Sequence, residues 1–169
     1  MHHHSSQSLT FYTVSTVYLL SKYMKYKIQK LKSVNNKILK ELTSLINQLN
    51  PDFSPPLKKE DIENILSSKS SEIFIATDEN DKIIGSISLC HYFQIEGRVK
   101  AWVEDLVVAK NHRRKGLATK LINKATSHAK LLGYQSIYLT SRPSRKGANK
   151  MYANLGFRKR NTNCYKKVL

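Results

Sequence analysis

The chain has 169 residues, of which 40% are hydrophobic and 24% charged. This is enough for one domain with a buried core, and it excludes a disordered or fibrous chain. Lys and Arg outnumber Asp and Glu by 29 to 12, for a net charge of +17. That charge favours an anionic partner such as nucleic acid, an anionic membrane surface or a phosphorylated small molecule, although solvated surface lysines also account for it. The lysines form no dense block, so a nucleic-acid partner is possible but not favoured.

The ends of the chain and its cysteines set the expected boundaries. Residues 1–6 (MHHHSS) resemble part of a purification tag, and we interpret 7–24 as an N-terminal extension whose apolar run is too short to span a bilayer. We expect a single domain over 25–169, with no membrane partner and a cytoplasmic location. Cys90 and Cys164 stand far apart without nearby ligand residues, so we expect reduced thiols and no metal site.

Hydrophobic periodicity predicts an alternating series of strands and helices after residue 24. The order is typical of an α+β domain with a mixed sheet between helices. The expected elements are a strand at 24–31, helices at 34–49 and 58–67, strands at 72–77, 83–91 and 98–108, a helix at 115–132 capped by Gly133, a strand at 135–140, a helix at 145–155 and a last strand at 164–168.

The most informative stretch is WVEDLVVAKNHRRKGLATKLINKA, residues 102–125. It predicts a buried strand, a basic turn and then a helix that starts near Gly116. Such a turn presents backbone N–H groups and the positive end of a helix to an anion, and glycine allows close approach. The turn lacks the Walker pattern GxxxxGK[ST] and the GxGxxG pattern. By itself a basic first helical turn is commonly only structural.

These motifs, with the tail motif NKMYANLGF, resemble the GNAT superfamily of acyl-CoA-dependent N-acetyltransferases. The resemblance covers residues 24–169 in element order, and its specific motifs lie between Glu104 and Phe157. The Glu-Asp pair and the Tyr-x-x-x-Gly-Phe motif are similar to the glucosamine-6-phosphate N-acetyltransferase branch. The tail is more similar to bacterial GNAT proteins of undefined acceptor. The implied fold is a mixed, mostly antiparallel sheet that is splayed between its fourth and fifth strands.

The resemblance also implies acetyl-CoA as cosubstrate, without a metal. The backbone of the fourth strand would pair with the pantetheine arm like an added strand. The pyrophosphate would lie on the N–H groups of the following turn, and Asn149 would add a contact. The implied contacts are Leu106, Val107 and Val108 in the strand, and Arg113, Arg114, Lys115, Gly116, Leu117, Ala118 and Thr119 in the turn.

Tyr152 is the candidate general acid. At helical spacing it is also consistent with a core aromatic residue, but the resemblance implies that it protonates or hydrogen-bonds the departing CoA thiolate. A phenol pKa of about 10 against a thiol pKa of about 8.5 makes full transfer uphill unless the site tunes them. An intact O–H would still stabilise the developing sulfur anion.

Glu104 and Asp105 interrupt an otherwise apolar strand, where carboxylates require a reason. They are either structural partners for cations or a general base that deprotonates the acceptor amine. Successive strand residues point to opposite faces, so both can reach one cleft only across a β-bulge. Glu104 is the preferred base and Asp105 the second candidate.

The acceptor carries no readable signature. The net charge favours a neutral or anionic small amine, such as an amino sugar phosphate, over a polyamine. Many GNAT proteins have an Asn seven residues before the tyrosine, where this chain has Arg145; this arginine and Arg142 could meet an anionic acceptor or the CoA 3′-phosphate. The rival hypothesis is a GNAT-like module that binds acyl-CoA or nucleic acid without turnover. A homodimer could form by pairing of the last strand.

Overall fold

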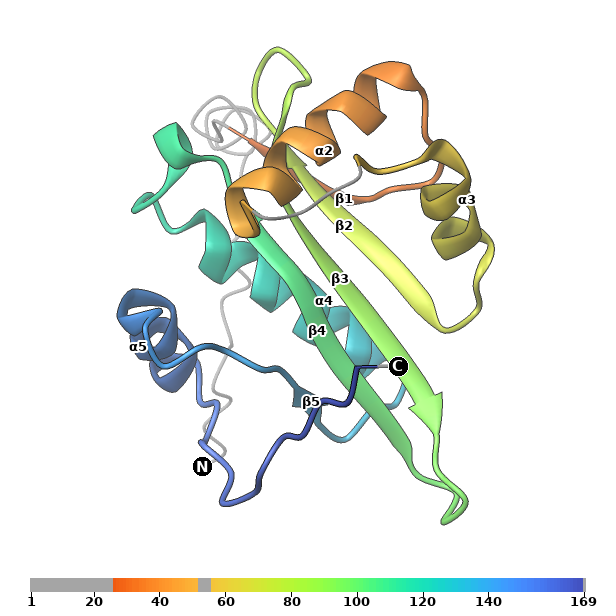
Figure 1. Cartoon of the computed structure of the whole chain (residues 1–169), viewed down its shortest axis with the longest axis vertical. Helices are drawn as coiled ribbons and strands as arrows, with labels where there is room; N and C mark the ends of the chain where they lie inside the picture. Colours follow the sequence, from red (N-terminus) through yellow and green to blue (C-terminus); the bar gives the residue numbers. More distant parts are fainter. Residues whose placement is uncertain (1–25, 52–55, 169) are drawn as a thin grey trace, which may run out of the picture.

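The computed structural model describes residues 26–51 and 56–168, which fold around one mixed sheet (Figure 1). Its strand order is β1-β2-β3-β4-β5. The first four strands are antiparallel to their neighbours, and β5 runs parallel to β4. The mixed, mostly antiparallel sheet is therefore confirmed. The strands are β1 (Lys27–Lys30), β2 (Ser71–Thr77), β3 (Ile83–Phe93), β4 (Val99–Val108) and β5 (Ile137–Tyr138).

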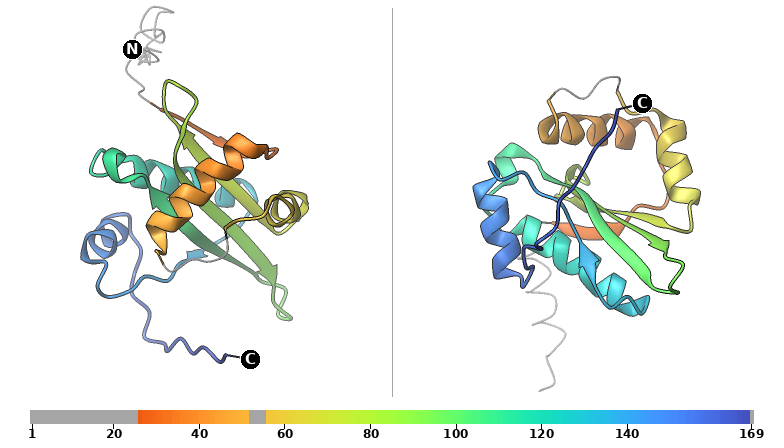
Figure 2. Two further views of the ribbon diagram at one scale, coloured as in Figure 1. Left: turned by 45° about the horizontal axis from the view of Figure 1, so that its top comes forward. Right: turned by 60° about the horizontal axis from the view of Figure 1, so that its bottom comes forward.

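Helices cover both faces of the sheet, and each face has its own core (Figure 2). α2 and α3 bury residues such as Leu45, which is 2% exposed, against one face. α4 and α5 cover the other face, where Leu121 is fully buried. The helices are α2 (Asn36–Leu49), α3 (Lys59–Ser67), α4 (Leu117–Leu131) and α5 (Lys146–Asn154), with a short 3₁₀ turn at Lys110–His112.

Local sequence explains where the helices begin and end. Asn35 caps α2 by accepting the Ile38 N–H at 2.9 Å, which satisfies one of the unpaired donors of the first turn. Gly133, at φ +79°, follows α4 in the left-handed conformation expected of a C-terminal cap. Most element boundaries agree with the expected ones to within two residues.

A β-bulge divides β4 into two parts. Ser88 of β3 pairs with Glu104 and Ser86 pairs with Val107, so Asp105 and Leu106 together stand opposite one residue of β3. Asp105 adopts φ +51°, a left-handed conformation that Asp tolerates better than most residues. The bulge changes the side-chain alternation, because Leu106 packs in the α4 core whereas Val107 packs in the α2 core.

The sheet opens between β4 and β5. The two strands pair only at Ala101–Ile137 and Trp102–Tyr138. Beyond Trp102, within the described residues, this edge of β4 has no strand partner. The expected splay is present, and β5 is shorter than the predicted strand at 135–140 because most of that segment already diverges from β4.

The prediction of a last strand at 164–168 is wrong, because these residues have no regular secondary structure. Tyr165 and Val168 are 87% and 81% exposed, so the segment has no buried face to reward pairing. In the left view of Figure 2 this segment stands away from the sheet. A homodimer stays a prediction, but the strand that motivated it is not formed.

The predicted tag and extension, residues 1–24, lie outside the described residues. Across residues 26–51 and 56–168, the structure contains no helix long and apolar enough to cross a membrane.

Candidate active site

A cleft of about 510 Å³ lies where β4 and β5 diverge. Four elements contribute its walls: the end of β4, the turn and first residues of α4, one side of α5 and the C-terminal end of α2. The contacts predicted from β4 and the turn line this cleft, except Lys115. The lining residues are Gln48, Leu49, Leu106, Val107, Val108, His112, Arg113, Arg114, Gly116, Leu117, Ala118, Thr119, Arg145, Gly147, Ala148, Met151 and Tyr152.

The turn before α4 exposes backbone N–H groups to the cleft. Arg114 and Gly116 both have positive φ, at +62° and +76°. A Cβ at Gly116 would meet nothing within 4 Å, so the glycine serves backbone conformation and access rather than packing. The first N–H groups of α4 have no intrahelical acceptor, and the helix dipole adds positive potential. This wall is suited to bind a phosphate.

Arginines fix the turn and reach across the cleft. Arg113 donates from Nε to the Val108 carbonyl at 2.8 Å, which ties the turn to the end of β4. The Arg114 guanidinium lies 3.8 Å from the position that a Cβ would take at Gly147, in the first turn of α5. A Cβ at 147 would therefore meet this guanidinium at ordinary van der Waals distance.

Two of the predicted cofactor contacts point elsewhere. Lys115 donates from Nζ to the Asn111 carbonyl at 3.1 Å and does not line the cleft. Asn149 donates from Nδ2 to the Arg142 carbonyl at 3.0 Å, which holds the segment before α5 against the helix. In this structure both side chains stabilise local loops.

Tyr152 lies in the cleft on α5, half-buried, with its ring 5.8 Å from that of Phe157. Desolvation raises the pKa of its phenol, Arg145 lowers it, and the charge of Glu104 raises it further, for a net increase. The hydroxyl therefore stays protonated at neutral pH. Glu104 must lie near enough to the phenol for its charge to act there.

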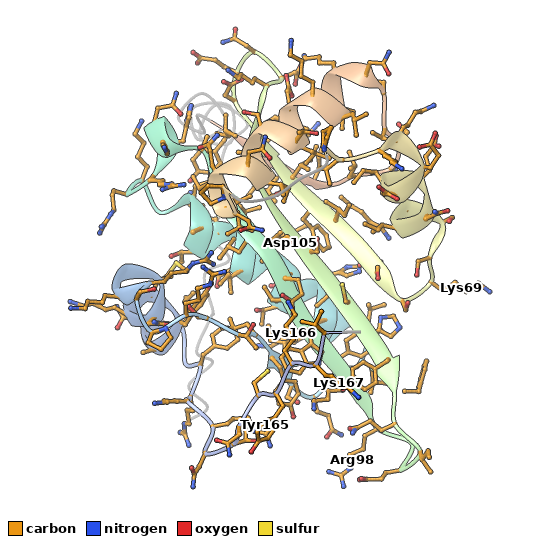
Figure 3. The ribbon with its side chains drawn as sticks, in the orientation of Figure 1. Lys69, Arg98, Asp105, Tyr165, Lys166 and Lys167 are labelled. Atoms are coloured by element: carbon orange, nitrogen blue, oxygen red, sulfur yellow. The ribbon has the colours of Figure 1, made fainter. Side chains whose placement is uncertain are left out.

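The carboxylates of Glu104 and Asp105 lie on the same side of the sheet because of the bulge. Ser88, the strand partner of Glu104, has its Oγ 3.5 Å from Asp105 Oδ2. Desolvation and then the Asp105 charge raise the pKa of Glu104, while desolvation raises the pKa of Asp105 and the Ser88 hydrogen bond lowers it. Both carboxylates remain exposed to solvent. Figure 3 labels Asp105 near the end of β4 that leads to the turn before α4.

Sequence reasoning missed the contribution of α2. Its last residues, Gln48 and Leu49, line the cleft, and Arg145 donates from Nη2 to the Leu49 carbonyl at 3.1 Å. Arg145 thus joins the end of α2 to the start of α5. His112 also lines the cleft. No local sequence pattern relates residues 48 and 145, so only the fold could bring them together.

In the part of the chain that the structure describes, no group of three or more His, Cys, Asp or Glu side chains is arranged to hold a metal ion. Cys90 is partly buried, and desolvation raises the pKa of its thiol.

The comparison with family models identifies the class of protein. The model described as the acetyltransferase (GNAT) family matches residues 39–157, which is more than half of the chain. The chain therefore belongs to the GNAT acetyltransferase family, as its motifs predicted.

Two curated relatives agree with this membership. An uncharacterized N-acetyltransferase of Methanocaldococcus jannaschii is 32% identical over 94 residues, which is 54% of this chain and 42% of that protein. N-alpha-acetyltransferase 30 of Schizosaccharomyces pombe is 28% identical over 124 residues, 73% of this chain and 79% of that protein. The chain thus spans less than half of the archaeal relative.

Solved structures share the fold. An aminoglycoside acetyltransferase from an uncultured soil metagenomic sample superposes with a TM-score of 0.74 at 21% identity, covering 86% of this chain and 97% of that one. Glucosamine-6-phosphate N-acetyltransferase from Arabidopsis thaliana gives a TM-score of 0.69 at 21% identity, covering 84% and 97%. At this identity the likeness concerns the fold alone.

Proposed function

We propose that the protein transfers the acetyl group of acetyl-CoA to the primary amine of a small molecule by direct attack, with Glu104 as general base and Tyr152 as general acid. The observation that carries the proposal is the position of Tyr152. Its phenol lines the same cleft as the first turn of α4, and its pKa responds to the charge of Glu104.

The donor would occupy the cleft. The edge of β4 beyond Trp102, which lacks a strand partner in the described chain, offers backbone groups to an extended amide-containing chain. The N–H groups at the start of α4, with Arg114 beside them, would receive the pyrophosphate. The residues that would contact the donor are Leu106, Val107 and Val108 on the strand, and Arg114 with Gly116 to Thr119 on the turn.

The acid and the base divide the proton transfers. Glu104 takes a proton from the acceptor ammonium, directly or through water, which frees the nitrogen lone pair. The amine nitrogen then attacks the thioester carbonyl carbon, the C–N bond forms and the C–S bond breaks. Tyr152 donates its proton or a hydrogen bond to the leaving sulfur. The products are an amide, free CoA and one proton released to solvent.

The acceptor is proposed only as a small primary amine. The named relatives and structures include an N-alpha-acetyltransferase, an aminoglycoside acetyltransferase and an amino sugar phosphate acetyltransferase. Family membership therefore leaves the acceptor open. The net charge of +17 favours a neutral or anionic amine over a polyamine.

The experiment is an acceptor panel assayed for acetyl-CoA-dependent thiol release, with the acetylated product identified by mass. The panel spans amino sugars, their phosphates, amino acids, peptides, polyamines and aminoglycosides. We expect release above the hydrolysis background with at least one amine and a loss of that release in Glu104→Gln. No release with any amine would contradict the catalytic proposal.

A thermal-shift titration distinguishes the rival module that binds without turnover. Under the enzyme proposal, acetyl-CoA raises the melting temperature of both wild type and Tyr152→Phe, while only wild type turns over at full rate. Equal protection of both proteins with no activity in either would instead support a non-catalytic acyl-CoA-binding module.

A further inference from the structure

An aromatic and cationic cluster lies on the sheet outside the cleft. The rings of Trp102 on β4 and Tyr138 on β5 have centroids 5.4 Å apart. The Lys100 ammonium lies 5.3 Å from the Trp102 ring centroid and 5.2 Å from that of Tyr138. The Arg160 guanidinium lies 5.4 Å from the Tyr138 centroid. We call these four residues the β4–β5 cluster.

The cations of this cluster have aromatic rings as neighbours instead of carboxylates. Across the described ranges, no Asp or Glu lies within salt-bridge distance of Lys100 or Arg160. The Ser136 hydrogen bond lowers the pKa of Tyr138, desolvation opposes this, and the charges of Arg160, Lys100 and Arg98 lower the pKa further. Positive charge is thus concentrated at the cluster without an internal counter-ion.

The cluster faces the same side of the sheet as the proposed base. Ala101 and Val103 pack into the α4 core, so the alternating residues Lys100, Trp102 and Glu104 face the opposite side. The bulge begins only after Glu104 and does not disturb this series. At about 3.3 Å per strand residue, the cluster lies roughly 7 to 13 Å from Glu104 along β4.

We propose that the β4–β5 cluster binds an anionic group of the acceptor, so that the natural acceptor is a small primary amine with a carboxylate or phosphate at its far end. This inference rests on the proposed function. The carboxylates of Glu104 and Asp105 attract the ammonium end, and Lys100 with Arg160 attracts the anionic end. Trp102 and Tyr138 supply an apolar wall for the intervening chain.

The charge pattern favours this acceptor over a nucleic acid. Aromatic rings beside cations also suit single-stranded nucleic acid. A phosphate backbone that left the cluster along β4 would, however, meet Glu104 and Asp105, two adjacent exposed carboxylates. A molecule with one cationic and one anionic end matches both charges.

The test uses straight-chain ω-amino carboxylates of graded length that bracket this span, each paired with the alkylamine of equal length. We expect the ratio of kcat/KM for the carboxylate over its alkylamine to peak at about 10-fold where the length matches, mainly through KM. A ratio near one at every length would overturn the inference while leaving the proposed transfer reaction intact.

Variants assign the effect to the cluster. Lys100→Gln and Arg160→Gln should each reduce the peak ratio about 3-fold or more. Lys69→Gln removes the same charge on the turn between α3 and β2, where Figure 3 labels it, and should leave the ratio unchanged. An equal loss in Lys69→Gln would mean that net charge alone selects the acceptor, and would overturn the inference.

Trp102 provides a readout that does not depend on turnover, because it is the only tryptophan in the chain. We expect the amino carboxylate of matching length to change the Trp102 fluorescence in a saturable way. In Lys100→Gln the same change should require higher concentrations, and the alkylamine of equal length should cause no change. No saturable change with any carboxylate would overturn the inference even if no amine is acetylated. Salt-sensitive binding of a single-stranded RNA to the cluster in its place would favour nucleic acid.

Discussion

The proposed donor cleft and the proposed acceptor face meet at the bulge in β4, but they are built differently. The cleft relies on backbone groups, since its anion-binding wall is the first turn of α4 and its other wall is the edge of β4. The proposed acceptor face relies on side chains from β4, β5 and the segment after α5, with Glu104 and Asp105 on β4 and the β4–β5 cluster beside them. Backbone groups are common to every sequence, whereas the selection of one acceptor over another depends on which side chains are present.

The largest expected effect comes from the base. Glu104→Gln should lower kcat about 10²- to 10⁴-fold, because the amide cannot accept the acceptor proton. Acetyl-CoA binding, followed by thermal shift, should be retained because Glu104 lies outside the cleft lining.

Asp105→Asn is the matched control for the base. It removes the neighbouring charge and should reduce kcat much less than Glu104→Gln does. A larger loss in Asp105→Asn would make Asp105 the base and contradict the assignment.

Tyr152→Phe should lower kcat by at most about 10²-fold, because water can supply part of the missing proton. The ring packing against Phe157 is retained, so the melting temperature should hardly change. The loss should be greatest with poor thiol leaving groups, measured with acetyl thioesters of different thiol pKa. A loss that is independent of the leaving group would indicate a role other than that of an acid.

Alanine substitutions at two glycines distinguish an effect of backbone strain from an effect on donor binding. Gly116 and Gly133 have φ of +76° and +79°, and a Cβ at either would meet nothing within 4 Å. Alanine at each should therefore destabilise the fold by about 1 kcal/mol. Only Gly116→Ala should weaken acetyl-CoA binding, by about 5-fold or more. Equal affinities in a calorimetric titration would remove the α4 turn from the donor site.

The smallest effect is a dependence on pH. Because the pKa values of Glu104 and Asp105 are raised in the folded protein, folding takes up protons between their ordinary and raised values. Stability should fall as pH rises through that window, by less than about 1 kcal/mol for these exposed groups. The value of kcat/KM should rise over the same window as Glu104 ionises. Unfolding free energies from urea melts and kcat/KM values that both rise, or both fall, with pH across this window would contradict the prediction.

The sequence predicted the parts of the site that are contiguous. Residues 102–125 read as strand, turn and helix because each has its own periodicity and Gly116 marks the start of the helix. The sequence showed only that a bulge was needed for both carboxylates to reach one cleft. It could not show that the bulge exists, because an extra residue in one strand is defined by the pairing with its partner strand. The link between Arg145 and Leu49 is long-range and left no local signal. The prediction of a strand at 164–168 failed because a local sequence pattern does not supply a partner strand.

Hydrogen–deuterium exchange with and without acetyl-CoA tests most directly the claim that backbone groups hold the donor. We expect slower exchange confined to the amides of Leu106 to Val108 and Arg114 to Thr119, with β2 and β3 unchanged. Protection that spares the α4 turn, or that appears instead on the face carrying the β4–β5 cluster, would contradict the account.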